Sequence, residues 1–209
     1  MSKAVCIFPQ DETTDFLRPL CEYICATFNA EEVGYCTSEK NDPKKIIYSK
    51  IKDANTIFFL GHGTSSSLYA KLNEVVLFTN DNIALLKGKQ LFLLACNSDK
   101  FIENYKLSDA IGFGFLPTST YDARHVRKLH SMRIEHLKES DIQSYNNALV
   151  NALINTLSIT TMADSHLFAE RLKFRSCEEI VKVLLQRQSP NYRHVADALY
   201  YFYKDAIFC

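Results

Sequence analysis

Two residues with the chemistry of a nucleophile and a base, Cys96 and His62, each follow an apolar run in this chain. His62 stands between two glycines just after residues 56–60, and Cys96 directly follows residues 90–95. A cysteine attacks as a thiolate, so it needs a neighbour that accepts its proton, and an imidazole can do this near neutral pH. The same imidazole can then protonate a leaving amine. The pair therefore indicates nucleophilic catalysis, provided that the fold brings the two side chains together.

The two apolar runs are predicted to be strands of a parallel sheet. Each is short, rich in aromatic and branched aliphatic residues, and without the alternation of a strand that has one exposed face. The segments before them are predicted as a strand, a helix, a strand and a helix, at 3–8, 13–29, 32–37 and 42–53. This alternation favours a doubly wound α/β fold, in which ligands bind at the carboxyl ends of the strands. Both candidate residues stand at such ends.

The rest of the chain completes one predicted domain over 1–209, with a sheet core over 1–120 and a helical portion over 121–209. Residues 68–78 have strand character and are predicted to form a hairpin or an excursion at the edge of the sheet. The other predictions are a helical stretch at 80–86, a loop or short helix at 99–108, a strand at 110–116, and helices at 121–138, 141–157, 165–188 and 192–208. We see no internal repeat and no low-complexity linker.

The composition limits the classes of partner. Lysine plus arginine and aspartate plus glutamate both number 24, so no net field favours nucleic acid or an anionic membrane. The local basic excess at 121–138 is predicted to be a solvated helix face rather than a docking surface for an acidic partner. The start of the chain is quickly polar and no apolar run is long enough to span a membrane, so we expect a cytoplasmic protein.

Seven cysteines are spread along the chain, and most are expected to be thiols that pack as small apolar groups. Cys21 and Cys25 share a face of the predicted helix at 13–29, where core packing is the favoured role. No histidine follows them at the spacing of a zinc finger. The sequence therefore predicts neither a metal nor a cofactor.

The two blocks around the candidate pair resemble the signature blocks of caspase-like (clan CD) cysteine peptidases, most of all the bacterial CHAT-type branch. The blocks are Ile-Phe-Phe-Leu-Gly-His-Gly at 57–63 and Leu-Phe-Leu-Leu-Ala-Cys-Asn-Ser at 91–98. The order of histidine and cysteine and the spacing of the strands also agree, and the architectural resemblance extends over roughly 1–120. It implies a caspase-like three-layer sandwich and a cysteine endopeptidase with a His62–Cys96 dyad that needs no third acid. The backbone amides of Gly63 and Cys96 would form the oxyanion hole.

The resemblance also implies how a protein or peptide substrate would bind. The position two before the cysteine, here Leu94, helps to line the pocket for the residue that precedes the scissile bond. Caspases proper carry Gln-Ala-Cys-Arg-Gly, whereas this chain has Leu-Ala-Cys-Asn-Ser, so we expect an apolar or small residue there and not strict aspartate specificity. The strand at 110–116 would pair with an extended substrate, with Gly112 and Gly114 permitting close approach and Phe113 or Phe115 forming the wall of a subsite. Tight packing of these glycines against a helix is an equal alternative.

The resemblance also suggests a role in a bacterial defence or cell-death system, and the sequence leaves open whether an activating partner protein is needed. Two alternatives stand beside the peptidase: a catalytically silent caspase-like interaction module, and a nucleotide-binding α/β module. The Gly-His-Gly at 61–63 lacks the third glycine of a dinucleotide loop, since Ser66 takes its place. A serine nucleophile at 65–67 would need a Gly-x-Ser-x-Gly elbow, which the chain does not contain.

Overall fold

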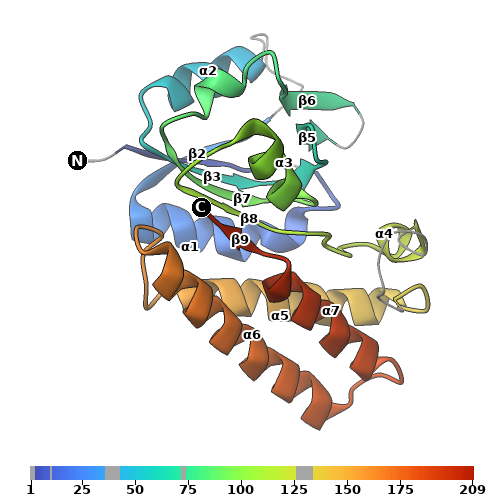
Figure 1. Cartoon of the computed structure of the whole chain (residues 1–209). Helices are drawn as coiled ribbons and strands as arrows, with labels where there is room; N and C mark the ends of the chain where they lie inside the picture. Colours follow the sequence, from blue (N-terminus) through green and yellow to red (C-terminus); the bar gives the residue numbers. More distant parts are fainter. Residues whose placement is uncertain (1–2, 10, 36–42, 72–73, 126–133) are drawn as a thin grey trace. The chain divides into compact units, whose positions relative to one another are not determined.

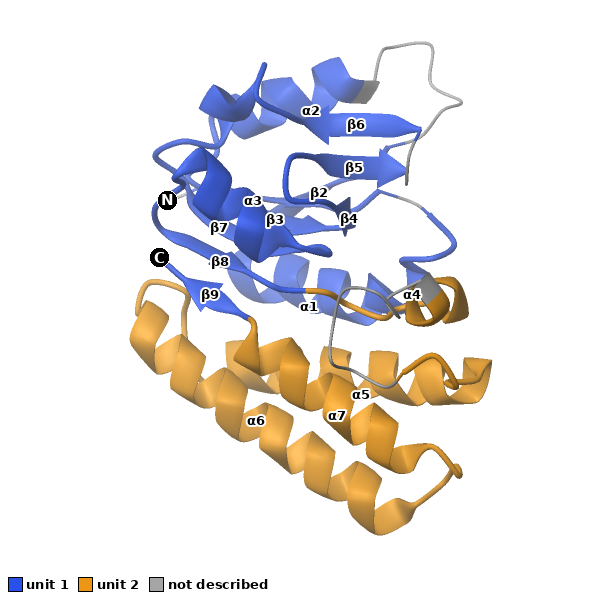
Figure 2. Ribbon diagram, turned by 45° about the vertical axis from the view of Figure 1, so that its right-hand side comes forward, with its two compact units in different colours: residues 1–114, 206–209 blue, residues 115–205 orange. Residues whose placement is uncertain are grey.

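The computed structural model describes residues 3–9, 11–35, 43–71, 74–125 and 134–209, in two compact units (Figure 2). Unit 1 comprises Met1–Gly114 and Ala206–Cys209, and unit 2 comprises Phe115–Asp205. The chain thus leaves unit 1 once and returns to it at its last residues. Unit 1 holds the sheets and unit 2 is built from helices.

Unit 1 is built on a six-stranded sheet of order β2-β1-β3-β7-β8-β9 (Figure 1). The strands are β1 (Ala4–Ile7), β2 (Ala30–Val33), β3 (Thr56–Leu60), β7 (Gln90–Leu94), β8 (Ala110–Gly112) and β9 (Ile207–Phe208). All neighbouring pairs are parallel except β8 and β9, which are antiparallel. The predicted α/β class with a mainly parallel sheet is confirmed.

The central strands β1, β3 and β7 are almost wholly buried, which explains why their sequences do not alternate. The prediction of 56–60 as a strand matches β3. The strand predicted at 110–116 is shorter, because β8 ends at Gly112. The second predicted strand is displaced towards the amino terminus as β2, and residues 36–37 of that prediction lie outside the described residues.

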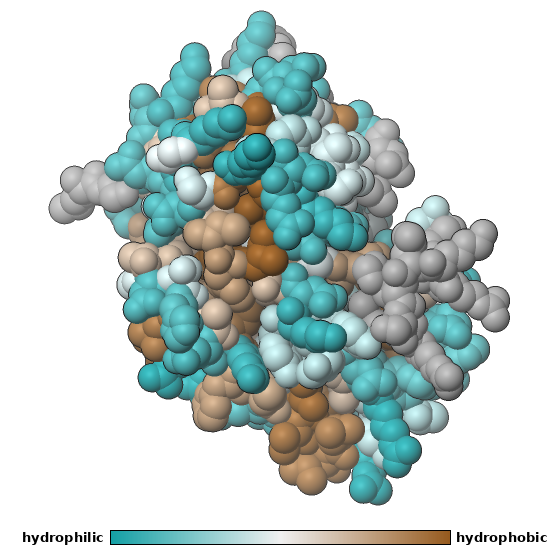
Figure 3. Space-filling view, in the orientation of Figure 1, coloured by the Kyte–Doolittle hydropathy of each residue, from teal (hydrophilic) through white to brown (hydrophobic). Residues whose placement is uncertain are grey.

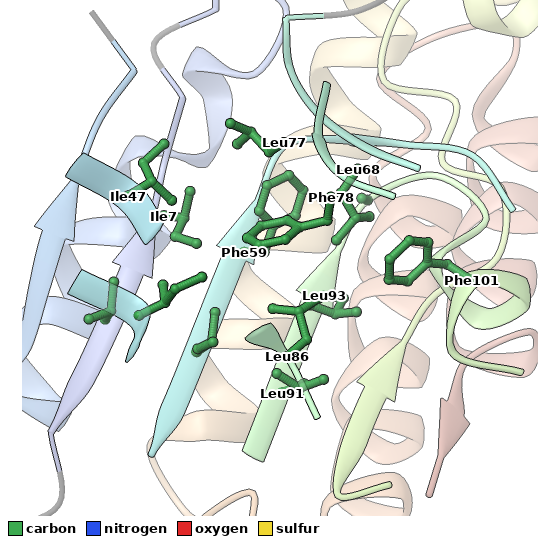
Figure 4. Packing of buried hydrophobic residues seen from close by; sticks show 14 of the residues in the cluster. Ile7, Ile47, Phe59, Leu68, Leu77, Phe78, Leu86, Leu91, Leu93 and Phe101 are labelled. Carbon is green, nitrogen blue, oxygen red and sulfur yellow. The ribbon is translucent and has the colours of Figure 1, made fainter. Parts of the chain in front are cut away.

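One face of the sheet is covered by α2 (Pro43–Lys52), α3 (Ser98–Tyr105) and a small second sheet. The small sheet contains β4 (His62–Gly63), β5 (Leu68–Lys71) and β6 (Val75–Phe78), and its antiparallel β5–β6 pair confirms the predicted hairpin. Figure 4 shows the core that these elements share with the sheet. The helix predicted at 80–86 is only the short 3-10 helix η2 (Ile83–Leu85).

The opposite face is covered by α1 (Arg18–Phe28), which follows the 3-10 helix η1 (Asp15–Leu17) (Figure 1). The Phe28 ring packs against Phe58 of β3 with a centroid distance of 5.1 Å, and Phe58 packs against Phe92 of β7 at 5.9 Å. On this face Cys6 of β1 meets Cys21 of α1.

Unit 2 contains α4 (Thr120–His125), α5 (Glu139–Leu157), α6 (Ser165–Gln186) and α7 (Tyr192–Lys204), of which the last three pack together. The helix predicted at 121–138 is wrong at its end, since residues 134–138 are not helical; residues 126–133 lie outside the described part of the chain. Exposed apolar side chains lie along α6, and Figure 3 shows apolar surface at the end of that helix. They are Phe174, Val181, Leu184 and Leu185. Among the helices that the structure describes, none combines the length and the apolarity needed to cross a bilayer.

Candidate functional site

The pairing of β3 with β7 brings His62 and Cys96 to the same edge of the sheet. Leu60 pairs with Leu94, and the Gly61 amide donates a hydrogen bond to the Leu94 carbonyl at 3.1 Å. His62 and Cys96 each stand two residues beyond one of these paired leucines. Because the strands are parallel neighbours, the two residues leave the sheet at adjacent positions of its carboxyl edge. The predicted placement on neighbouring strand ends is confirmed.

Gly63 is the point at which the two loops touch. A Cβ atom on this buried residue would lie 2.8 Å from the Cys96 carbonyl oxygen and 2.9 Å from the Ala95 Cβ. Side chains other than hydrogen therefore do not fit without a shift of the backbone that carries the cysteine. The glycine that follows His62 is explained by this close approach.

The imidazole of His62 is held by a loop that follows β1. Its Nε2 lies 2.9 Å from Thr13 Oγ1 and 3.4 Å from Asp11 Oδ2. The Thr13 hydroxyl donates to Asp11 Oδ1 at 2.7 Å, so its oxygen is left to accept a hydrogen bond from Nε2–H. This arrangement places the proton of neutral His62 on Nε2 and leaves Nδ1 as the basic nitrogen. The side chains of His62 and Asp11 are only 12% and 11% exposed.

The Asp11 carboxyl is an acidic group near His62 that the sequence reasoning missed. Burial raises its pKa, but hydrogen bonds from the Thr13 hydroxyl and amide and the nearby His62 imidazole outweigh burial, so the net pKa lies below the ordinary value. The carboxylate is therefore charged at neutral pH. No local pattern in the sequence marks it, because Asp11 reaches this edge only through the pairing of β1 with β3, which joins distant segments.

Cys96 lies in the turn between β7 and α3 and is half-buried. Asn97 adopts a left-handed conformation with φ of 56° and accepts a hydrogen bond from the Phe101 amide at 3.1 Å. The cysteine thus precedes the first turn of α3 by two residues.

The buried hydroxyl of Ser98 fixes this turn to two strands. Its Oγ donates to the Leu93 carbonyl at 2.6 Å and accepts from the Phe113 amide at 2.8 Å. The Asn97 amide also donates to the Gly114 carbonyl at 2.9 Å. The segment that follows β8 therefore holds the loop that carries Cys96.

The residues predicted to bind substrate lie mostly inside unit 1. The Leu94 side chain is 1% exposed, and the fully buried Phe113 ring packs on Phe92 with a centroid distance of 5.5 Å. This burial argues against contact between either side chain and a substrate, which is a correction to the sequence-based assignment. A Cβ at Gly112 would lie 2.5 Å from Ile102 Cδ1 and 2.9 Å from the Asp99 amide nitrogen, so this glycine permits packing against α3.

Gly114 is buried, and its carbonyl accepts the hydrogen bond from Asn97 described above. Phe115 is half-buried and is the first residue of unit 2. The assignment of Phe115 to a substrate subsite therefore stays a prediction. Of the predicted set, His62, Gly63 and Cys96 lie together.

A thiol with a lowered pKa, that of Cys25, lies away from this edge on α1. A hydrogen bond with Cys6 lowers the pKa of Cys25, burial raises it and a hydrogen bond with Cys21 lowers it, which leaves the pKa at about 7. Its half-buried side chain is also accessible. Rapid alkylation alone therefore cannot identify a catalytic cysteine in this protein.

A cavity of about 270 Å³ lies in unit 2, between α5, α6 and the segment that leads to α7. Its lining is mainly polar and includes the ion pair between Glu179 and Lys182, with 2.6 Å between Oε1 and Nζ. None of the candidate catalytic residues lines it. No protein-family model, curated protein or solved structure matches the chain.

Proposed function

We propose that the chain is a caspase-like cysteine endopeptidase that hydrolyses peptide bonds of a protein substrate with Cys96 as nucleophile and His62 as general acid and base. The observation that carries the proposal is the strand register, which sets the two residues side by side with Gly63 against the Cys96 carbonyl. Strand pairing and close backbone contact of this kind hold a nucleophile and a base in one arrangement before substrate arrives.

The chemistry follows from these positions. His62 Nδ1 accepts the Cys96 proton, and the thiolate attacks the scissile carbonyl to form a tetrahedral intermediate. The amides of Gly63 and Cys96 would donate to the oxyanion. The intermediate collapses as Nδ1–H protonates the leaving amine, and water then hydrolyses the thioester with His62 as base.

Asp11 is assigned as a positioning residue for His62. Its carboxylate lies near Nε2, both directly and through the Thr13 hydroxyl, so it fixes the tautomer and favours the imidazolium that forms after proton transfer. The resemblance to caspase-like peptidases implied a dyad alone. The proposed constellation instead has three members, with the acid taken from the loop after β1.

The decisive experiment compares cleavage of a peptide library by the wild-type protein and by Cys96→Ala. We expect sequence-selective cleavage by the wild type, and a loss of about a thousandfold or more in kcat/KM in the variant. Cys25→Ser is the matched control, because it removes the thiol with the lowered pKa on α1 and should leave kcat/KM unchanged. Turnover that survives in Cys96→Ala, or that disappears in Cys25→Ser, would refute the assignment.

Asp11→Asn tests the positioning role. Since the amide keeps the shape but not the charge, kcat should fall about a hundredfold while KM stays near the wild-type value. Thr13→Val should reduce kcat as well, because it removes the hydroxyl that accepts from Nε2. If KM rose in these variants while kcat stayed at the wild-type value, the loop would bind substrate and would not position His62.

A further inference from the structure

Three cysteines from separate parts of unit 1 converge on the face of the sheet that α1 covers. Cys6 belongs to β1, and Cys21 and Cys25 stand one turn apart on α1. Their sulfur atoms all lie within 4.8 Å of one another, and the Sγ atoms of Cys6 and Cys21 are 3.6 Å apart. The cluster lies across the sheet layer from α2 and α3, and none of its members belongs to the His62–Cys96 edge.

The size of this triangle suits a single metal ion. A thiolate sulfur lies about 2.3 Å from a small d¹⁰ ion, which sets the three sulfurs of a trigonal site about 4.0 Å apart. The 3.6 Å between the sulfurs of Cys6 and Cys21 falls just short of that value, and no separation in the cluster exceeds 4.8 Å. Any separation longer than about 4.0 Å would therefore shorten by at most about 0.8 Å on binding.

The donor set selects a soft ion that accepts three ligands. Within the described residues the group contains sulfur donors alone, with no histidine or carboxylate in it. Thiolate ligands select copper(I), zinc or iron–sulfur clusters, and structural zinc and iron–sulfur clusters are normally held by four ligands, which leaves copper(I) as the ion that suits three. A hard ion such as magnesium or calcium would require oxygen ligands.

The surroundings of the three cysteines give an ion access from one side and place a positively charged side chain near the sulfurs. Cys6 and Cys21 are fully buried, but Cys25 is half-buried, so the ion can reach the cluster from the side of Cys25. Arg18 stands three residues before Cys21 on the same face of α1, with its guanidinium 4.4 Å from the centre of the Phe8 ring and 2.6 Å from Glu32 Oε1. Its positive charge offsets part of the negative charge of a thiolate complex, while the paired Glu32 carboxylate acts on the Cys25 thiol in the opposite sense.

We propose that Cys6, Cys21 and Cys25 form a three-coordinate thiolate site for one copper(I) ion. Binding exchanges three S–H protons for three S–Cu bonds and releases the protons to solvent, with no change in the oxidation state of the metal or of sulfur. The ion would join β1 to α1 and so stabilise the packing of that helix on the sheet. The site is independent of the proposed peptidase chemistry.

The test is a titration of the reduced full-length chain with copper(I) under anaerobic conditions, in competition with the chromogenic chelator bicinchoninate. We expect the wild type to withdraw a single copper ion per chain from the chelator and to develop thiolate-to-copper absorption in the ultraviolet. Cys25→Ser should weaken binding by about a hundredfold or more, because it removes a ligand at a half-buried position that tolerates serine. Cys177→Ser and Cys96→Ala are the controls, and both should bind as the wild type does.

A second measurement separates loss of binding from loss of folding. One equivalent of copper(I) should raise the thermal midpoint of the wild type and of both controls, and leave that of Cys25→Ser unchanged. Far-ultraviolet circular dichroism checks that the apo form of each variant is folded. Failure of the wild type to compete with the chelator, undiminished binding by Cys25→Ser, or tighter retention of zinc(II) than of copper(I) would each overturn the proposal.

Discussion

Single residues around the candidate site serve packing as often as chemistry. The signature block ends in Asn97 and Ser98, and the structure gives both a role in shaping the turn that carries Cys96. The glycines divide in the same way: Gly63 lies against the cysteine loop, while Gly112 lies against α3. The sequence left two interpretations open for Gly112, close approach of a substrate or packing against a helix, and its contacts support packing.

Ser98→Ala should destabilise unit 1 although it removes a single oxygen atom. The buried Phe113 amide would lose the acceptor at 2.8 Å, and the Leu93 carbonyl would lose its donor at 2.6 Å. An unsatisfied buried polar group costs about 1–3 kcal/mol, so we expect the free energy of unfolding to fall by that amount in a denaturant titration.

The matched control is Ser158→Ala, since the Ser158 hydroxyl donates to the Asn155 carbonyl at an exposed position. We expect a change within about 0.5 kcal/mol there. Equal effects of the two substitutions would show that the Ser98 hydrogen bonds do not hold the turn.

At the scale of elements, the sequence was sufficient for the two buried strands that carry the candidate residues. The runs that form β3 and β7 are unbroken and apolar, so their lengths and their carboxyl ends could be predicted, and with them His62 and Cys96. The contribution of Asp11 could not be predicted from the sequence. It depends on the placement of β1 beside β3, which is a pairing between distant segments. The end of β8 at Gly112 was equally hidden, since the carbonyls of the next two residues accept hydrogen bonds from amides at the start of α3.

The start of α5 provides a pH-dependent prediction. The buried Asp141 carboxylate accepts hydrogen bonds from the Lys138 amide at 2.8 Å and from Asn191 Nδ2 at 2.9 Å, so it caps the helix and ties it to the start of α7. Burial raises the pKa of Asp141, but hydrogen bonds from Ser189, Asn191 and Lys138 together lower it by more. The net pKa is therefore below the ordinary value.

A lowered pKa means that the folded state binds fewer protons than the unfolded chain as the pH approaches the ordinary range of a carboxyl group. The stabilisation by Asp141 is therefore complete above the unfolded pKa of about 3.9 and is lost as the pH falls through the folded pKa. Asp141→Asn should lower the free energy of unfolding by about 1 kcal/mol at pH 7 and flatten its decline in acid. Denaturant titrations from pH 7 to pH 3 measure both effects. A variant with the wild-type acid dependence would contradict this account.

At the scale of the whole molecule, the segment that forms unit 2 is inserted in the sequence between two strands that are neighbours in the sheet of unit 1. The chain leaves unit 1 after β8 and returns as β9, whose residues Ile207 and Phe208 pair with Gly112 and Ile111. Sequence reasoning extended the last helix to residue 208, because two apolar residues that follow an amphipathic helix look like its continuation. Their partner lies almost a hundred residues earlier, and only the fold shows it.

Removal of the last three residues should therefore destabilise unit 1, although they follow a helix of unit 2. A chain that ends at Ala206 would lose the two hydrogen bonds between Ala110 and Cys209, of 3.1 and 2.9 Å, and the packing of Ile207 on the core. Two backbone hydrogen bonds correspond to about 1–3 kcal/mol. The uncovered edge of β8 should also promote association between chains. Denaturant titration and light scattering measure these two effects, with Cys209→Ser as the control that keeps the backbone. If the shortened chain unfolds at the wild-type midpoint and remains as monodisperse as the control, β9 does not hold the edge of the sheet.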